Sequence, residues 1–188
     1  NANSEKSGSQ KIVRIATNGK TDGEARIRAD VAYTKDEPTM MLAAALPLAF
    51  TEKPSRAAVI GFGTGLSTHT LLADPGLAVV DTIEIEQAII TGATAFGDRN
   101  QRAYQDHRSH IHIEDAKSYF SSQQQRYDII LSEPSNPWVS GVGALFSQEF
   151  YQFIPRFLSE QGVLVQWIQL YEINDELVAS ILNGLLPN

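Results

Sequence analysis

Cysteine is absent from this sequence of 188 residues, which excludes both a disulfide framework and a zinc site built on thiolates. Positive charge is scarce: 15 lysines and arginines stand against 22 acidic residues, and the formal net charge of −7 disfavours nucleic acid as a partner. Apolar runs fall short of the ~20 residues that span a bilayer, and the first residues lack a signal-peptide pattern. We therefore expect a soluble, cytoplasmic segment that makes no membrane contact of its own.

The composition that remains is typical of a globular domain. Apolar residues make up 43% and charged residues 20% of the sequence, and its length suffices to bury a core without staples. Residues 1–10 are small and polar, so we interpret them as a disordered linker or cloning remnant. We assign residues 11–50 to an N-terminal hairpin and helix, and residues 51–188 to an α/β domain.

The N-terminal part predicts one hairpin and one helix. Apolar and polar residues alternate before Asn18-Gly19, which indicates a hairpin over residues 11–29. Asp36 as the N-cap and Pro38 in the first turn then start a helix. This helix is apolar on nearly every side from Met40 to Phe50, so we expect it to be buried against another surface, the sheet edge or a partner.

From residue 57 onward, strand-like and helix-like segments alternate, which predicts a parallel, doubly wound sheet. The expected strands are residues 57–60, 78–85, 110–113, 127–132 and 162–170. The expected helices are residues 66–73, 87–96, 116–122, 148–159 and 175–186. We expect a kink in the fourth helix, because Pro155 lacks a backbone donor.

Three glycines follow the first of these strands. The apolar run at residues 57–60 leads directly into Gly61, Gly63 and Gly65, and a helix comes next. Ligands of α/β sheets bind outside the carboxyl ends of the strands, and glycine lets the backbone approach them closely. We therefore interpret these glycines as part of a nucleotide or nucleoside site.

Acidic residues follow the next two strands. Glu84 lies about 20 residues after the last glycine, the spacing at which a carboxylate accepts from both hydroxyls of a ribose, whereas Glu86 is interpreted as a solvated acid. Asp115 can accept from an exocyclic amine, and the small Ala116 leaves room for a flat base. Asp115 also suits the N-cap of the next helix, and one oxygen could serve each role.

The fourth strand ends in an unusual loop, residues 132–138. Glu133 would face the glycines across the cleft, where it could contact an amine and accept its proton. Asn136 and Trp138 are similar in type to the asparagine and aromatic residue with which amino methyltransferases orient an amine, although the second proline of that motif is absent. We treat Thr64, Asn136 and Trp138 as candidate substrate-binding residues.

Two other patterns favour structural interpretations. His110 and His112 share one face of the third strand and would suit a metal, but half-buried histidines on a strand near the sheet edge explain them better, so no metal is predicted. Phenylalanines 146, 150, 153 and 157 recur at helical spacing and indicate a core stripe.

From Asn18 to Tyr171, the sequence resembles the spermidine synthase-like group of the class I S-adenosylmethionine-dependent methyltransferase fold. Residues 61–65 resemble its glycine motif, Glu84 its ribose ligand, and Asp115-Ala116 its adenine-binding pair. Residues 132–138 are most similar to members fused to membrane-embedded segments. The resemblance implies a Rossmann-like, doubly wound, mostly parallel sheet, and its family continues beyond the last helix with further strands. This sequence, which stops at Asn188, is therefore either a fragment truncated at the C-terminus, or its missing sheet edge is supplied by another chain. Because proteins normally cover such an edge, we expect self-association as a homodimer.

The resemblance also implies the ligands. The donor would be S-adenosylmethionine or its decarboxylated form, with methylthioadenosine as the product of the latter, and the acceptor a small amine or polyamine. The family's synthases have acids where Thr64 and Asn136 stand and an aspartate where Glu133 stands, so the nucleoside half of the site is retained better than the polyamine half.

Three functions follow as alternatives: aminopropyl transfer to an amine, methyl transfer to an amine or small molecule, and a non-catalytic nucleoside-binding module. The resemblance also makes this segment a candidate for the soluble part of a membrane-anchored protein.

Overall fold

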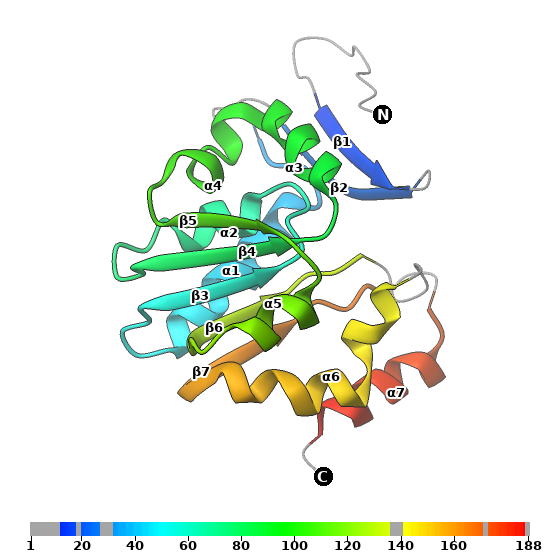
Figure 1. The fold of residues 1–188 in the computed structure, drawn as a ribbon. Coiled ribbons are helices and arrows are strands. Elements are labelled where there is room, and N and C mark those ends of the chain that lie inside the picture. The colour runs from blue at the N-terminus through cyan, green and yellow to red at the C-terminus, as the bar shows by residue number, and fades with distance from the viewer. Residues whose placement is uncertain (1–11, 18–19, 27–31, 136–140, 171–172, 187–188) are drawn as a thin grey trace.

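A five-stranded parallel sheet forms the centre of the structure, a computed structural model that describes residues 12–17, 20–26, 32–135, 141–170 and 173–186 (Figure 1). Residues 1–10, expected to be a linker, lie outside the described residues. The elements in chain order are β1 (Ile12–Thr17), β2 (Lys20–Arg26), α1 (Glu37–Phe50), β3 (Arg56–Ile60), α2 (Leu66–Leu71), β4 (Val79–Glu84), α3 (Gln87–Ala93), η1 (Thr94–Arg99), α4 (Arg102–Gln105), β5 (Ser109–Ile113), α5 (Ala116–Ser122), β6 (Tyr127–Ser132), η2 (Val142–Phe146), α6 (Gln148–Phe153), η3 (Ile154–Phe157), β7 (Leu158–Gln166) and α7 (Asp175–Leu185).

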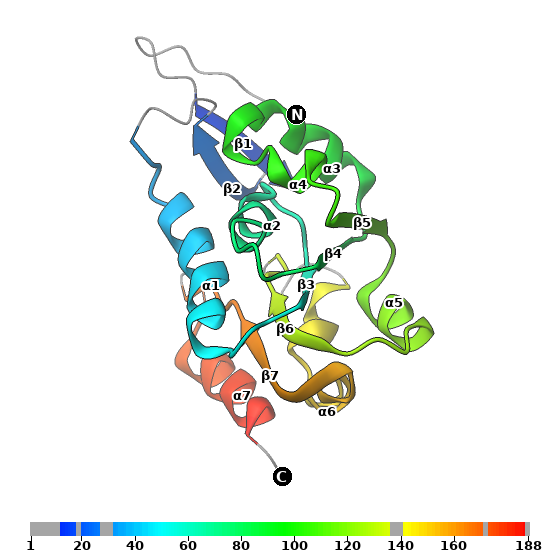
Figure 2. The ribbon, with the colours of Figure 1, turned by 90° about the vertical axis from the view of Figure 1, so that its left-hand side faces the viewer.

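The strand order β5-β4-β3-β6-β7 confirms the predicted doubly wound sheet. The central strand β3 is apolar throughout its last four residues because both of its faces are covered. Ala57 and Val59 pack with α1 and α2, whereas Ala58 and Ile60 pack on the opposite face with α5, α6 and α7 (Figures 1 and 2). The predicted phenylalanine stripe joins this second core.

The N-terminal hairpin forms as predicted, with β1 antiparallel to β2. Ala25 of β2 packs with Phe62 and Phe96, so the hairpin is joined to the segment that follows β3. Pro38 lies in the first turn of α1, but Asp36 has helical dihedral angles and makes no capping hydrogen bond through its side chain. The expected capping role of Asp36 is therefore wrong.

Helix α1 is buried against the sheet, as expected, but on one side alone. Only the stripe that faces the sheet is enclosed, including Ala44 and Pro47. On the opposite side Leu42, Leu46 and Phe50 follow one another along the helix, and Phe50 is 78% exposed. A helix that lies on one face of a sheet covers only its inner stripe, however apolar its other side is.

Several element boundaries differ from the prediction. The helix expected to run to residue 96 changes into η1 at Thr94, and the short α4 was missed. Gly97 has φ of +60° and ψ of −122°, which no helix contains. The helix expected to be kinked at Pro155 ends at Phe153, and η3 follows it. Consequently β7 begins earlier than predicted, at Leu158.

Both sheet edges have one hydrogen-bonded neighbour among the described strands: β5 pairs with β4, and β7 pairs with β6. Strand β5 lies at the sheet edge, as expected; His112 is half-buried there, whereas His110 is exposed. His110 and His112 lie against Asp81, and the residues described contain no metal-ligand group of three acidic or histidine side chains. Within the same residues, no helix has the length and hydropathy that crossing a membrane requires.

Candidate functional site

The carboxyl ends of β3, β4, β5 and β6 meet at one edge of the sheet, and the predicted site residues follow them. The backbone hydrogen bonds continue past the ends of the strands. Gly61 donates from its nitrogen to the Ile83 carbonyl at 2.8 Å, and Glu133 donates to the Ile60 carbonyl at 2.9 Å. The glycine loop, residues 61–65, is therefore held between the ends of β4 and β6.

The structure requires glycine at the three predicted positions for different reasons. Gly61 has φ of +91°, and a Cβ on it would lie 2.5 Å from the Glu133 carbonyl oxygen. Gly65, with φ of +76°, is the residue before α2, and the Phe62 ring fills the space beside it. Gly63 has φ of +49°, and a Cβ there would meet nothing within 4 Å. Open space beside Gly63 is where a ligand could approach the loop.

Glu84 is held at the end of β4 by two backbone donors. Its Oε2 accepts from the Phe62 nitrogen and its Oε1 from the Glu86 nitrogen, both at 2.9 Å. Each carboxylate oxygen has two lone pairs, so Glu84 can still accept from two hydroxyl groups. The side chain of Glu86, interpreted as a solvated acid, is exposed and also caps α3 by accepting from the Ala88 nitrogen.

Asp115 caps α5, since its Oδ1 accepts from the Ser118 nitrogen at 2.9 Å. Ala116, in the first turn of α5, is buried. Sequence reasoning missed two apolar neighbours of this place: Ile85, which is 70% exposed, and Ile113, which pairs with Glu84 in the sheet. Ile85 comes directly after the predicted ribose acid and exposes an apolar surface against which a flat ring could pack. Its position next to Glu84 is the sequence signal that could have identified it.

Glu133 follows β6 with its side chain half-buried. Burial raises the pKa of the Glu133 carboxyl to about 7, although a hydrogen bond with Ser67 acts in the opposite direction. A carboxyl with this pKa changes its protonation state near neutral pH, which suits a group that accepts a proton from a substrate.

The Thr64 hydroxyl points toward α1. It donates to the Met40 sulfur at 3.2 Å and accepts from the Leu66 nitrogen at 3.3 Å, and the side chain is buried. Ser67 donates to the Met40 carbonyl at 3.4 Å. Met40 thus lies against the glycine loop and the residue that contacts Glu133. The other two candidate substrate residues, Asn136 and Trp138, lie outside the described residues.

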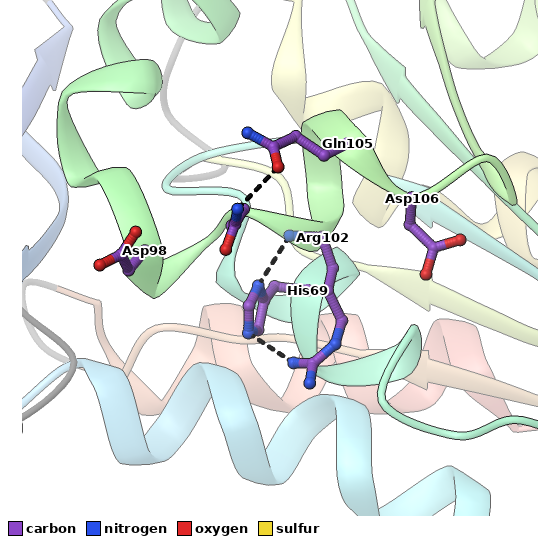
Figure 3. Close-up of a pocket in the computed structure, with 6 residues that line it drawn as sticks. His69, Asp98, Arg102, Gln105 and Asp106 are labelled. Atoms are coloured by element: carbon purple, nitrogen blue, oxygen red, sulfur yellow. Dashed lines mark hydrogen bonds between the residues drawn. The ribbon is translucent and has the colours of Figure 1, made fainter.

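A separate open pocket lies between α2 and α4, and its lining residues are His69, Asp98, Gln101, Arg102, Gln105 and Asp106. Figure 3 shows His69 beside Arg102, whose backbone nitrogen lies 3.1 Å from Nδ1 and whose Nη1 lies 2.8 Å from Nε2. Burial and the Arg102 charge lower the pKa of His69. None of the predicted site residues lines this pocket.

Comparison with known proteins gives a consistent result. The family model described as the spermine/spermidine synthase domain matches residues 39–186. The polyamine aminopropyltransferase of Moorella thermoacetica is 29% identical over 140 residues, which cover 74% of this chain and 49% of the relative. The polyamine aminopropyltransferase of Thermoplasma volcanium is 31% identical over 121 residues, 64% of this chain and 44% of the relative. The chain spans less than half the length of these curated relatives.

Two kinds of solved structure are similar in fold. A spermidine synthase in complex with the transition state analogue AdoDATO has a TM-score of 0.67 at 22% identity, covering 86% of this chain and 56% of its own. Human methyltransferase-like protein 13 in complex with SAH has a TM-score of 0.60 at 22% identity, covering 80% and 71% of the two chains. These matches confirm the predicted Rossmann-like α/β fold.

Proposed function

Because the chain belongs to the spermine/spermidine synthase family, we propose that it transfers an aminopropyl group from decarboxylated S-adenosylmethionine to an amine. The donor would bind along the edge formed by the glycine loop and the ends of β4 and β5. Gly61, Gly63 and Gly65 would lie on the sulfonium side. Glu84 would accept from the ribose hydroxyls, and Asp115 with Ala116 would border the adenine.

Three observations at this edge support the donor site. The space beside Gly63 is open, and both Glu84 oxygens retain free lone pairs after accepting one backbone donor each. Asp115 uses Oδ1 for the helix cap, and among the described groups none donates to its Oδ2. Ile85, the residue after Glu84, adds an exposed apolar surface.

The proposed chemistry is a nucleophilic substitution at carbon. The neutral amine nitrogen attacks the propyl carbon beside the sulfonium, a C–N bond forms, and the C–S bond breaks with its electron pair left on sulfur as methylthioadenosine departs. The incoming primary ammonium must lose one proton to become the attacking amine, and the secondary ammonium that forms keeps the positive charge that the sulfonium gives up. Glu133 would accept that proton, since its carboxylate form is available near neutral pH.

The position of Glu133 is the observation on which this function depends most. Its backbone is fixed against Gly61, so the carboxyl is attached to the same rigid corner as the glycine loop.

Product mass after incubation with putrescine tests the proposal. A gain of one aminopropyl group with the decarboxylated donor supports it, and methylated product with S-adenosylmethionine favours methyl transfer instead.

Methyl transfer is the second candidate because few acidic groups are left for a diamine. The Thr64 hydroxyl is bonded to Met40, and of the two acids beside the glycine loop in the described part of the chain, Glu84 is assigned to the ribose and Glu133 to the amine. A methyl acceptor needs fewer charged contacts than a diamine. Tight binding of methylthioadenosine without turnover on any amine would indicate a non-catalytic nucleoside-binding module.

Replacement of Glu84 tests the donor site separately from the chemistry. We expect Glu84→Gln to weaken methylthioadenosine binding by about tenfold, because a carboxylate accepts more strongly than an amide from ribose hydroxyls. Titration calorimetry measures the affinity. Glu86→Gln is the matched control, since Glu86 caps α3 and has no proposed contact with the ligand. Equal affinities for the two variants would contradict the ribose role of Glu84.

A further inference from the structure

The end of η1 carries two buried polar side chains beside the glycine loop. Asn100 is 1% exposed, and the preceding Arg99 is also buried. The turn at Gly97, whose φ is positive, brings the chain back so that the Asn100 nitrogen faces the Gly97 carbonyl at 3.4 Å. The backbone of Asn100 then continues into α4, because its carbonyl accepts from the Ala103 nitrogen at 2.9 Å. Local structure therefore fixes where the Asn100 side chain starts.

The Asn100 amide joins two elements that border the proposed donor site. Its Nδ2 donates to the Thr64 carbonyl at 2.6 Å and to the Ala93 carbonyl at 2.9 Å. Both partners are carbonyl oxygens, so the amide nitrogen and not its oxygen must face them. Thr64 lies between Gly63 and Gly65 in the glycine loop, and Ala93 is the last residue of α3, the helix that follows Glu84.

The adjacent Arg99 holds the other side of the same loop through α1. Its Nε lies 3.0 Å from Oε1 of Glu37, a residue with no exposed side-chain surface. The second Glu37 oxygen accepts from the Thr34 nitrogen at 2.5 Å. From this anchored end, α1 places Met40 on the Thr64 hydroxyl. Asn100 therefore holds the glycine loop directly, and Arg99 holds α1, whose Met40 lies against the loop.

We propose that Asn100 is a positioning residue for the nucleoside donor: its amide holds the glycine loop at a fixed distance from the β4–α3 segment that carries Glu84. This inference rests on the proposed function for its ligand. Glycines at three of five positions give the free loop many conformations, which binding must restrict. The two Asn100 hydrogen bonds impose that restriction before the ligand arrives, so the loop and the ribose acid are already correctly spaced.

Two variants of Asn100 and one matched control test the role. Asn100→Ala removes both hydrogen bonds. Asn100→Asp keeps the shape but replaces the donor by an oxygen that faces two carbonyls. Asn174→Ala removes a single side-chain hydrogen bond from another asparagine, at the N-cap of α7. Each protein is titrated with methylthioadenosine at a temperature where circular dichroism shows it fully folded.

We expect Asn100→Ala to weaken methylthioadenosine binding by about tenfold or more, and Asn174→Ala to leave it unchanged. Asn100→Asp should bind weakly at neutral pH and recover affinity relative to the parent protein as the pH falls, because the protonated carboxyl regains a donor. Unaltered affinity in both Asn100 variants, with only a lower Tm, would show a purely structural role and overturn the proposal.

Hydrogen exchange of the peptide that contains residues 61–66 gives a measurement that needs no ligand. We expect faster exchange there in both Asn100 variants and no change in Asn174→Ala. If the parent protein binds no methylthioadenosine, the proposed function fails, and this exchange still decides whether Asn100 orders the loop. Unchanged exchange in residues 61–66 would overturn the inference by itself.

Discussion

The buried surroundings of Glu133 disfavour the charged form of its carboxyl group. The ordinary pKa of a glutamate is 4.5, and burial raises that of Glu133 to about 7. Between these two values the folded protein binds more protons than the unfolded chain, so stability falls as the pH rises from 4.5 to about 7. The charged carboxylate is therefore retained at neutral pH at a cost in stability, which is the pattern expected of a group kept for chemistry.

At the residue scale, replacing Glu133 should separate activity from stability. We expect Glu133→Gln to lower kcat by about 100-fold, because the proton acceptor is lost. The same variant should have a higher Tm than the parent at pH 8, since an amide is cheaper to bury than a carboxylate. Steady-state kinetics and thermal unfolding measure the two effects.

The activity of the parent protein should rise with pH up to about 7 and then level, following ionisation of Glu133. Glu149→Gln is the matched control, because Glu149 lies exposed at the start of α6. A pH profile that is flat between 5 and 8, or a Glu133→Gln variant as active as the Glu149→Gln control, would contradict the proposed role.

A second residue-scale prediction concerns Asp106 and Arg108. Three hydrogen bonds join them, and Arg108 also donates to the carbonyls of Leu72, Asp74 and Leu77. Hydrogen bonding from Arg108 lowers the pKa of Asp106 to about 2. Because the folded-state pKa is depressed, this pair contributes stability above pH 4 that is lost as the pH falls toward 2.

We therefore expect Asp106→Asn to be less stable than the parent at pH 7 and closer to it at pH 2.5. Urea unfolding at the two pH values measures the difference. If the variant loses the same stability at pH 7 and at pH 2.5, the charge of the Asp106 carboxylate does not contribute to the stability of the fold.

At the element scale, the sequence predicted most of what the sheet requires and little of what joins the helices. Strand β6 and helix α5 were predicted at their observed bounds, since buried strands and capped helices are marked by local composition. The turn at Gly97 and α4 were missed because short irregular segments have no periodicity. The same is true of the site: Glu84 and Glu133 follow from strand order, whereas Asn100 acts across 36 residues and leaves no local signal.

The glycine loop provides the prediction at this scale. We expect Gly61→Ala to lower the stability by several kcal/mol, because the new Cβ would lie 2.5 Å from the backbone oxygen of Glu133, which no side-chain rotation can relieve. Gly92→Ala in α3 is the matched control, with nothing within 4 Å of its added Cβ, and it should be neutral or stabilising. Urea unfolding compares them. Equal stabilities would mean that the loop and β6 separate easily.

At the scale of the whole molecule, β7 is an outer strand with one hydrogen-bonded neighbour among the described strands, and α1 beside it exposes Leu42, Leu46 and Phe50. Parallel sheets are normally covered, so self-association through this side is the expected way to shield it. We expect sedimentation to show a dimer at micromolar concentrations. Leu46→Glu should weaken the dimer by at least tenfold, because each copy would bury a charge. A parent protein that stays monomeric up to 100 μM would contradict this expectation.

The pairing of Gly61 with Glu133 has a consequence for synthesis. The corner at the glycine loop is complete only when a strand from the second half of the chain lies beside a loop from the first half, and α1, from nearer the start, also covers that loop. During translation, the ribosome releases the glycines long before their partner. A nascent chain that ends before β6 therefore has the glycine loop without the strand that supports it, so this corner forms late in synthesis.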